Sequence, residues 1–432
     1  MEGMPKYSMP LQDLPCLSLQ GSMLSESKKN NKRKSKGCLS EGLDIECTPT
    51  ELIQQWSPHH KHQRLISKGK ENDRNQFVLA RRSRRKKEST TSGISWDHLP
   101  DELLLRILFY IPLQDLLRMT IVCKRWHRLA FDESLWHSVD LEGLTHTGSA
   151  LQQVLKTGVR MLRCPRSFVE ELDFTGIGPL QLVRLDLSSS IIPTSSLKSI
   201  ICQCRLLEYL SLEGLQLSDT IISALSKNPN LLQLNLSGCS SFSGPALADM
   251  LKSCVSIEQL NISWCEFNNN HVKSVVNNLS PTATHLNLSG YRENLMLDDV
   301  KMLVTRCPDI QTLDLSDSTL LMADCFHVLK QLKALVHLSL SRCYHIHLAA
   351  LTDLGKTFPM LRLLDVFGIV NGSHLSSLKK ELPLVSINTL PFSSVARPTP
   401  ATAARPVGYF MWNTKCRLRF NLSHLHVQPV VR

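Results

Sequence analysis

The chain has 432 residues, of which 42% are hydrophobic and 20% are charged. These fractions exclude a wholly disordered, collagen-like or fibrous protein. Its apolar runs are far shorter than the roughly 18 residues that cross a bilayer. The first twenty residues contain Pro5, Pro10 and Pro15 and lack the apolar core of a signal peptide. We therefore expect a soluble intracellular protein, and the length favours two or three domains.

The N-terminal region, residues 1–93, holds most of the net charge of +11. It is polar, so we expect it to be a disordered basic regulatory region. Its short Lys/Arg clusters are typical of nuclear import signals, while a solvated linker or a nucleic-acid contact are the alternatives. We favour import, with the protein in nucleus and cytoplasm, and expect neither a nucleic-acid nor a membrane partner. The residues assigned to import are Lys32, Arg33, Lys34, Arg81, Arg82, Arg84 and Arg85.

Residues 94–140 are predicted to form a three-helix module. Pro100, followed by Asp101 and Glu102, suits the first turn of a helix that Pro112 ends. A short second helix and a third helix follow. The apolar stripes of these three helices contain Leu103, Leu104, Ile107, Leu108, Ile111, Leu116, Leu117, Val122, Trp126, Leu129 and Ala130. A module of this size buries little apolar surface. We therefore expect it to complete its core against a partner, or to cap the segment that follows.

A leucine-rich repeat fills residues 141–390. One leucine of each unit serves as its index residue, and these recur every 24 to 27 residues: Leu185, Leu210, Leu234, Leu260, Leu286, Leu313, Leu338 and Leu364. Weaker units around Val139, Leu162 and Ile387 extend the array to about ten or eleven repeats. The predicted fold class is therefore α/β: three helices, then a leucine-rich-repeat solenoid with parallel strands on its concave face and helices outside.

Cysteines recur at fixed places in this repeat. Cys239, Cys265 and Cys343 lie five residues after an index leucine, where small side chains suit tight turns. We predict that they are packing residues and expect no metal site and no cofactor. The chain also lacks a nucleophile elbow, a P-loop and an HExxH motif, so we predict no catalytic residue.

Departures from the repeat identify candidate binding residues. The residue after each index leucine is short and polar, as in Asn235 or Asp314, and we expect these side chains to form a solvated concave strip. Four or six residues after the index leucine, small residues give way to large or charged ones. This set predicts a protein-binding rim; the alternative is that Trp264 folds into the core. The rim residues are Trp264, Arg292, Asp317, Arg342 and Tyr344.

The segments LPDELLLRI, DLLRM and VCKRWHRLAFDESLW of the helical module resemble an F-box. An F-box followed by Cys-type leucine-rich repeats is similar to the F-box/leucine-rich-repeat substrate receptors of SCF ubiquitin ligases. The resemblance implies a non-catalytic receptor that binds the Skp adaptor, and through it a cullin and a RING subunit. The residues implied in adaptor binding are Leu99, Pro100, Leu103, Leu104, Ile107, Leu116, Val122 and Trp126.

The segments ISWC, LNLSGYR, LSLSRCY, FGIV and KCRL resemble the cell-cycle receptors of this class. That resemblance implies recognition of phosphorylated Kip-type cyclin-dependent-kinase inhibitors, together with a Cks accessory subunit, through the rim. It further implies that cyclin A binds the N-terminal region and that residues 391–432 form a tail along the repeats, although residues 398–407 depart from the pattern. Ser57, which precedes a proline, is the candidate phosphosite.

Such a receptor acts by proximity, because holding a substrate near a charged conjugating enzyme raises the effective concentration of the attacking lysine. Two other classes stay open at this point. A nucleic-acid-binding regulator would use the basic N-terminal region, and its binding would fall steeply with salt. A passive inhibitor or scaffold would clasp an enzyme with the repeats and would not need the F-box.

Overall fold

The computed structural model describes residues 96–144, 147–174, 178–399 and 410–419. In this part of the chain, no helix combines the length and the apolar composition that crossing a membrane requires.

The helical module begins with a short 3-10 helix and contains three α-helices. Pro100 and Pro112 stand at the N-caps of the first two α-helices, where a missing N–H costs nothing. Arg125 ties the entry of the module together, because its guanidinium donates to the backbone carbonyls of Trp96, Asp97 and Leu99. The elements are η1 (Trp96–His98), α2 (Asp101–Leu108), α3 (Leu113–Met119), α4 (Lys124–Ala130) and η2 (Glu133–Leu135).

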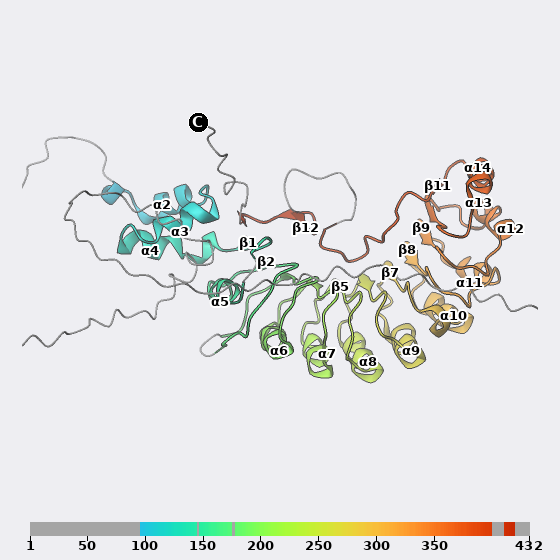
Figure 1. The fold of residues 1–432 in the computed structure, drawn as a ribbon, viewed down its shortest axis with the longest axis horizontal. Helices are drawn as coiled ribbons and strands as arrows, with labels where there is room; N and C mark the ends of the chain where they lie inside the picture. The colour runs from blue at the N-terminus through green and yellow to red at the C-terminus, as the bar shows by residue number, and fades with distance from the viewer. Residues whose placement is uncertain (1–95, 145–146, 175–177, 400–409, 420–432) are drawn as a thin grey trace, which may run out of the picture. The chain divides into compact units, whose positions relative to one another are not determined.

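The repeats form one curved sheet with helices on its outer side (Figure 1). Each index leucine pairs in register with the next, as Leu185 with Leu210 and Leu234 with Leu260, and their side chains are fully buried. The degenerate units at Val139, Leu162 and Ile387 also supply strands, so the predicted fold class is confirmed. The strands are β1 (Ser138–Asp140), β2 (Met161–Arg163), β3 (Arg184–Asp186), β4 (Tyr209–Ser211), β5 (Gln233–Asn235), β6 (Gln259–Asn261), β7 (His285–Asn287), β8 (Thr312–Asp314), β9 (His337–Ser339), β10 (Leu363–Asp365) and β11 (Ser386–Ile387).

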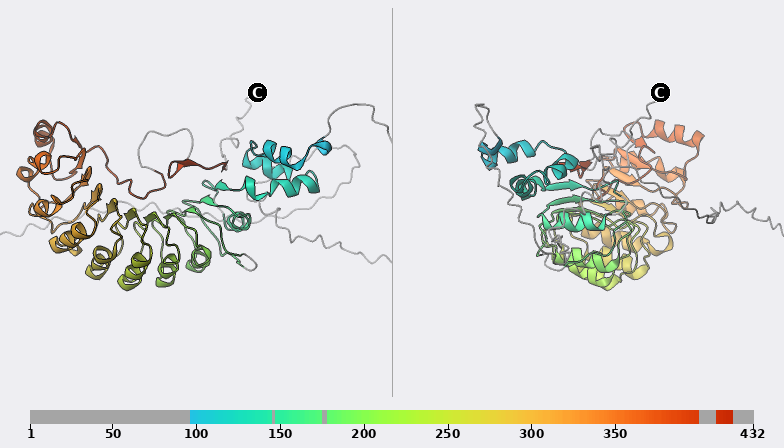
Figure 2. Two further views of the ribbon diagram at one scale, coloured as in Figure 1. Left: turned by 180° about the vertical axis from the view of Figure 1, so that it is seen from behind. Right: turned by 60° about the vertical axis from the view of Figure 1, so that its left-hand side comes forward.

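The helices of the solenoid bury one face against these strands, and Figure 2 shows from behind that they lie outside the sheet. Their apolar residues recur at helical spacing, as Leu247, Met250 and Leu251 do in α8. The helices are α5 (Gly148–Lys156), α6 (Thr194–Gln203), α7 (Asp219–Leu225), α8 (Gly244–Ser253), α9 (Asn269–Asn278), α10 (Leu297–Arg306), α11 (Cys325–Leu329), α12 (Leu348–Leu351), α13 (Leu354–Thr357) and α14 (Gly372–Glu381).

The recurring cysteines are buried packing residues, as predicted. The thiols of Cys239, Cys265 and Cys343 donate to backbone carbonyls of the preceding repeat, at 3.0, 3.1 and 3.3 Å. Burial raises the pKa of Cys265 and of Cys343 to about 12, so these thiols stay protonated at neutral pH. They join one repeat to the next.

The C-terminal tail returns from the last repeat to the first. It forms a small hairpin, β12 (Phe410–Met411) with β13 (Thr414–Lys415), and then a strand, β14 (Leu418–Arg419). Strand β14 pairs in parallel with β1, so that the sheet has 12 strands and its last strand in sequence lies beside its first. Nothing in the repeat pattern predicted this strand.

Candidate functional site

The polar residue after each index leucine is buried, so the expectation of a solvated strip was wrong. The side-chain oxygens of Asn235, Asn287 and Asp314 each accept a hydrogen bond, 3.0 Å long, from the backbone N–H two residues later. Short Asn and Asp side chains close such turns by bonding their own backbone. The periodic polar residues therefore turn the chain at the end of each strand.

From Val139 to Leu364, the fourth residue after each index position has a left-handed backbone. Glycine adopts this conformation freely, whereas another residue costs roughly 1–2 kcal/mol. The glycines at this position are Gly143, Gly214, Gly238, Gly290 and Gly368. The other residues there are Arg166, Ser189, Trp264, Asp317 and Arg342. Three of the predicted rim residues thus occupy a place that favours glycine, and strained residues of this kind are concentrated at functional sites.

Three of the rim residues contact one another, although the turns of Gly290 and Asp317 lie between that of Trp264 and that of Arg342. The Nε of Arg342 donates to Oδ1 of Asp317 at 2.8 Å, and a second guanidinium nitrogen pairs with Oδ2. The Arg342 guanidinium carbon also lies 5.9 Å from the centre of the Trp264 ring, within the range of a cation–π contact. The pKa of Arg342 is raised, chiefly by its hydrogen bond to Asp317, so the guanidinium stays protonated where it lies beside the indole.

The Trp264 indole lies on the surface and is 48% exposed, which excludes the alternative that it folds into the core. It covers the next turn, where Gly290 leaves room: a Cβ at Gly290 would stand 2.7 Å from Cδ2 of Trp264. Gly368 similarly lies beside Arg342 and Tyr344. The glycines at the neighbouring turns therefore leave room for the Trp264 and Arg342 side chains to pack over them.

The two remaining predicted rim residues are also exposed. Tyr344 is 60% exposed. Arg292 begins a short 3-10 helix, η3 (Arg292–Asn294), and its backbone carbonyl accepts from the N–H of Thr319. We call the five residues together the rim: Trp264, Arg292, Asp317, Arg342 and Tyr344.

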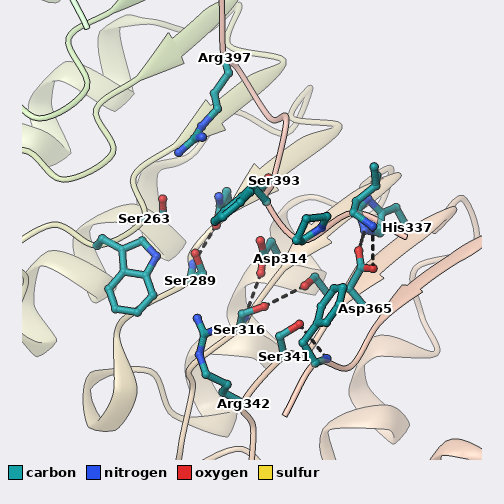
Figure 3. Close-up of a pocket in the computed structure, with 17 residues that line it drawn as sticks. Ser263, Ser289, Asp314, Ser316, His337, Ser341, Arg342, Asp365, Ser393 and Arg397 are labelled. Atoms are coloured by element: carbon teal, nitrogen blue, oxygen red, sulfur yellow. Dashed lines mark hydrogen bonds and ion pairs between the residues drawn. The ribbon is translucent and has the colours of Figure 1, made fainter. Parts of the chain in front are cut away.

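A hollow of about 450 Å³ lies between the rim and the tail (Figure 3). Its floor carries serines and two buried carboxylates, Asp314 and Asp365, and Nε2 of His337 lies 2.7 Å from Oδ2 of Asp365. Arg342 and Arg397 stand at its edges (Figure 3). The resemblance implied a tail along the repeats, but the sequence did not show which tail residues line this hollow, because the tail follows no repeat.

The tail is fastened to the concave face by polar contacts. The side-chain amide of Asn261 donates to the carbonyl of Val395, and the N–H of Ala396 donates to Oε1 of Gln259, each at 3.2 Å. Arg397 pairs with Glu213 at 3.2 Å. These contacts keep residues 395–397 next to the hollow.

The residues predicted to bind an adaptor divide into two groups. Leu104 and Leu116 are buried and stabilise the helical module. Leu103, Ile107 and Val122 are exposed by 44%, 40% and 60%. Leu99 and Trp126 are partly buried, and Pro100 is exposed.

Other large apolar side chains add to this exposed surface of the module. The prediction did not include them because their spacing departs from the helical stripe. We call the combined set the apolar patch: Leu103, Ile107, Phe109, Tyr110, Ile121 and Val122. Exposed apolar surface on this scale marks a site of protein interaction.

Several predicted sites fall outside the described residues. They are Ser57 and the import residues Lys32, Arg33, Lys34, Arg81, Arg82, Arg84 and Arg85. Within the described ranges, no group of three His, Cys, Asp or Glu side chains is arranged to hold a metal ion.

Comparison with known proteins gives the class that this geometry defines. The F-box-like profile matches residues 96–142, the helical module, and a leucine-rich-repeat profile matches residues 149–419. The chain is therefore an F-box protein with leucine-rich repeats. The repeat profile is that of the SKP2 LRR domain, and the chain belongs to this family.

Individual relatives share the same architecture. F-box/LRR-repeat protein 23 of Arabidopsis thaliana is 27% identical over 232 residues, 51% of this chain and 47% of that protein. F-box/LRR-repeat protein 21 of Bos taurus is 24% identical over 236 residues, 48% of this chain and 53% of that protein. Human F-box/LRR-repeat protein 12 is 41% identical over 58 residues, 13% of this chain and 18% of that protein. The chain thus spans about half or less of the length of these relatives.

Proposed function

We propose that the chain is the substrate-recognition subunit of an SCF ubiquitin ligase. The observation that carries this proposal is the apolar patch on an F-box that is joined directly to a repeat solenoid with a strained, charged rim. The patch would bind the Skp adaptor, which brings a cullin and a RING subunit. The solenoid would hold the substrate, and the chain itself would supply no catalytic group.

The rim would recognise a phosphorylated Kip-type cyclin-dependent-kinase inhibitor together with a Cks accessory subunit, as in the second S-phase kinase-associated protein, and so promote the G1/S transition. The chemistry of the rim supports this choice. Asp317 occupies one edge of the Arg342 guanidinium and fixes its plane, so the other edge would meet a partner's acceptor in a defined geometry. The exposed indole of Trp264 adds the aromatic contact area common at interface hot spots.

The N-terminal region completes the proposal. It would bind cyclin A, carry a regulatory phosphate at Ser57 and direct the protein to the nucleus, with a second pool in the cytoplasm. The basic clusters and the Ser-Pro sequence in residues 1–93 are the features that support this part.

Co-elution with purified Skp adaptor tests the first step. We expect a complex that survives high salt, because apolar burial drives it. Replacing Leu103 and Ile107 together by Asp should abolish the complex. Met302→Asp is the control, since Met302 is comparably exposed, at 48%, but lies on α10 of the solenoid. Absence of a wild-type complex would contradict the proposal and favour a scaffold that works without the F-box.

Binding of a phosphopeptide from a Kip-type inhibitor, in the presence of Cks, tests the second step. Arg342→Ala should weaken it by about tenfold or more, the loss expected from a hot-spot arginine. Arg166→Ala is a matched control. Arg166 also has a left-handed backbone and pairs with an acidic residue, Glu142, but this pair lies in the first repeats, away from the rim. Equal effects of the two substitutions would contradict recognition at the rim.

A further inference from the structure

The C-terminal strand β14 completes the core at the first repeat. Leu418 pairs with Val139 and is fully buried in the main core, in the position that an index leucine would hold. The tail therefore supplies the rung that precedes the first repeat. It also covers an edge whose N–H and C=O groups would otherwise be unpaired.

Arg417, next to this strand, contacts three parts of the structure. Its backbone N–H donates to Oγ of Ser138 in β1 at 2.8 Å. Its guanidinium donates to the carbonyls of Leu108 and Phe109, both at 3.0 Å, and also to that of Leu135.

The positions of these carbonyls explain why an arginine is needed. Leu108 and Phe109 end α2, where backbone carbonyls lack partners within the helix and a positive charge is favourable. Leu135 ends η2, which leads from the F-box into β1. The guanidinium carbon also lies 4.3 Å from the centre of the Phe109 ring. The guanidinium of Arg417 thus joins the end of the first F-box α-helix to the connecting segment, while its backbone N–H bonds the edge of the sheet.

The same tail is fastened further back to the concave face. Arg184 in β3 donates to the carbonyl of Trp412 at 3.3 Å, and its guanidinium carbon lies 4.3 Å from the centre of the Tyr209 ring. Residues 395–397 lie beside the hollow below the rim, as described above. The backbone N–H of Trp412 donates to the carbonyl of Pro398 at 2.8 Å, so the segment beside the hollow is bonded to the segment that leads to the F-box.

We propose that β14 is a latch and that Arg417 is the positioning residue that holds the F-box in one orientation on the solenoid. The latch would fix the distance between a substrate on the rim and an adaptor on the apolar patch. The contacts of Arg417 on both the F-box and the sheet would hold this orientation whether or not a substrate binds. The consequence for ubiquitin transfer rests on the proposed function.

A distance measurement on the full chain tests the orientation. Fluorophores are placed, through unnatural amino acids, at two exposed residues, Glu102 in α2 and Lys273 in α9. We expect a single narrow distance distribution in the wild type and a broad one in Arg417→Ala. Arg417→Lys retains the charge but cannot bond three carbonyls at once in this geometry, so it should also broaden the distribution. An unchanged distribution in both variants would overturn the latch.

Arg205→Ala is the matched control. Arg205 also caps a helix end, by donating to the carbonyls of Cys202 and Cys204 at 2.7 Å, but it joins no second module. It should leave the distribution narrow. If Arg417→Ala fails to fold, Arg417→Lys decides the outcome, because it keeps a long, positively charged side chain near the carbonyls at the end of α2.

The ubiquitination rate separates this proposal from the proposed function. The assay contains adaptor, cullin, RING subunit and saturating substrate. Arg417→Ala should lower the ubiquitination rate roughly threefold to tenfold, because a substrate held at a variable distance is less often near the conjugating enzyme. Its affinities for adaptor and phosphopeptide should stay unchanged. If the wild type binds neither, the proposed function fails while the distance distributions still decide the latch. If both bind and the rate is unchanged, the role in positioning is overturned.

Discussion

The F-box and the solenoid bury their apolar residues to very different degrees. The index leucines of the solenoid are fully buried, because each repeat is covered by a neighbour on both sides. The F-box is too short for this and leaves Tyr110 and Ile121 more than four-fifths exposed. This difference in burial indicates which kind of surface each part offers to a protein partner. The F-box presents apolar surface, whereas the solenoid presents a few charged and aromatic side chains at strained turns.

The largest expected effect separates buried from exposed apolar residues. Leu286→Ala should lower the free energy of unfolding by about 2–5 kcal/mol, as buried leucine truncations do. Ile107→Ala should change it by less than about 1 kcal/mol, since the side chain is 40% exposed, while weakening adaptor binding. Chemical denaturation and adaptor titration measure the two effects. Similar losses of stability would show that the F-box and the solenoid are not as different as proposed.

A smaller effect distinguishes the rim from ordinary turns. Gly290→Ala adds a Cβ to a left-handed residue and places it 2.7 Å from Trp264, so we expect a loss of roughly 2 kcal/mol or more. Gly214→Ala has the same backbone strain but a nearest contact of 3.8 Å, and should lose only about 1 kcal/mol. Thermal denaturation compares the two. Equal losses would mean that Trp264 does not rest on Gly290.

Relieving the backbone strain at two left-handed residues should affect stability and phosphopeptide binding differently. Trp264→Gly and Ser189→Gly both place glycine at a left-handed position. Each relieves about 1 kcal/mol of strain, although Trp264 also loses its contacts. Ser189→Gly should therefore stabilise the chain without changing phosphopeptide binding, whereas Trp264→Gly should keep near-normal stability and bind about tenfold more weakly or worse. Normal binding by Trp264→Gly would remove Trp264 from the rim.

The smallest expected effect concerns one buried carboxyl group. The pKa of Asp314 is raised from its ordinary value of 3.8, first by burial, while the Ser316 hydrogen bonds and His337 lower it. The folded chain therefore binds more protons than the unfolded chain above pH 3.8, and stability falls as pH rises through the folded pKa.

Asp314→Asn tests this effect, because other repeats carry Asn at the same position and accept the same hydrogen bond. The variant should gain stability over the wild type as the pH rises, and the difference should stop changing below pH 3.8. Denaturation midpoints across pH 3 to 7 measure the difference. A constant difference would show that Asp314 is not the titrating group.

The sequence predicted the helical module, the strand of each repeat and the buried cysteines. Each of these follows from spacing within one unit, which side-chain periodicity records directly. The same spacing singled out Trp264, Asp317 and Arg342, which the structure brings into contact. It did not distinguish Leu104, which is buried, from Leu103, which is exposed, because the two are adjacent on one apolar stripe.

By itself, the sequence determined the repeat, its register and the residues that depart from it, because a 24- to 27-residue period fixes which side chains align. Only the tertiary structure decided that the polar residue after each index leucine is buried, that four of the five rim residues are left-handed, and that Leu418 pairs with Val139. The physical reason is that these features depend on residues far apart in the sequence. Burial, backbone strain and the closing of the sheet depend on neighbours from other repeats, and the closing strand pairs with a partner that lies almost the whole length of the repeats away in the chain.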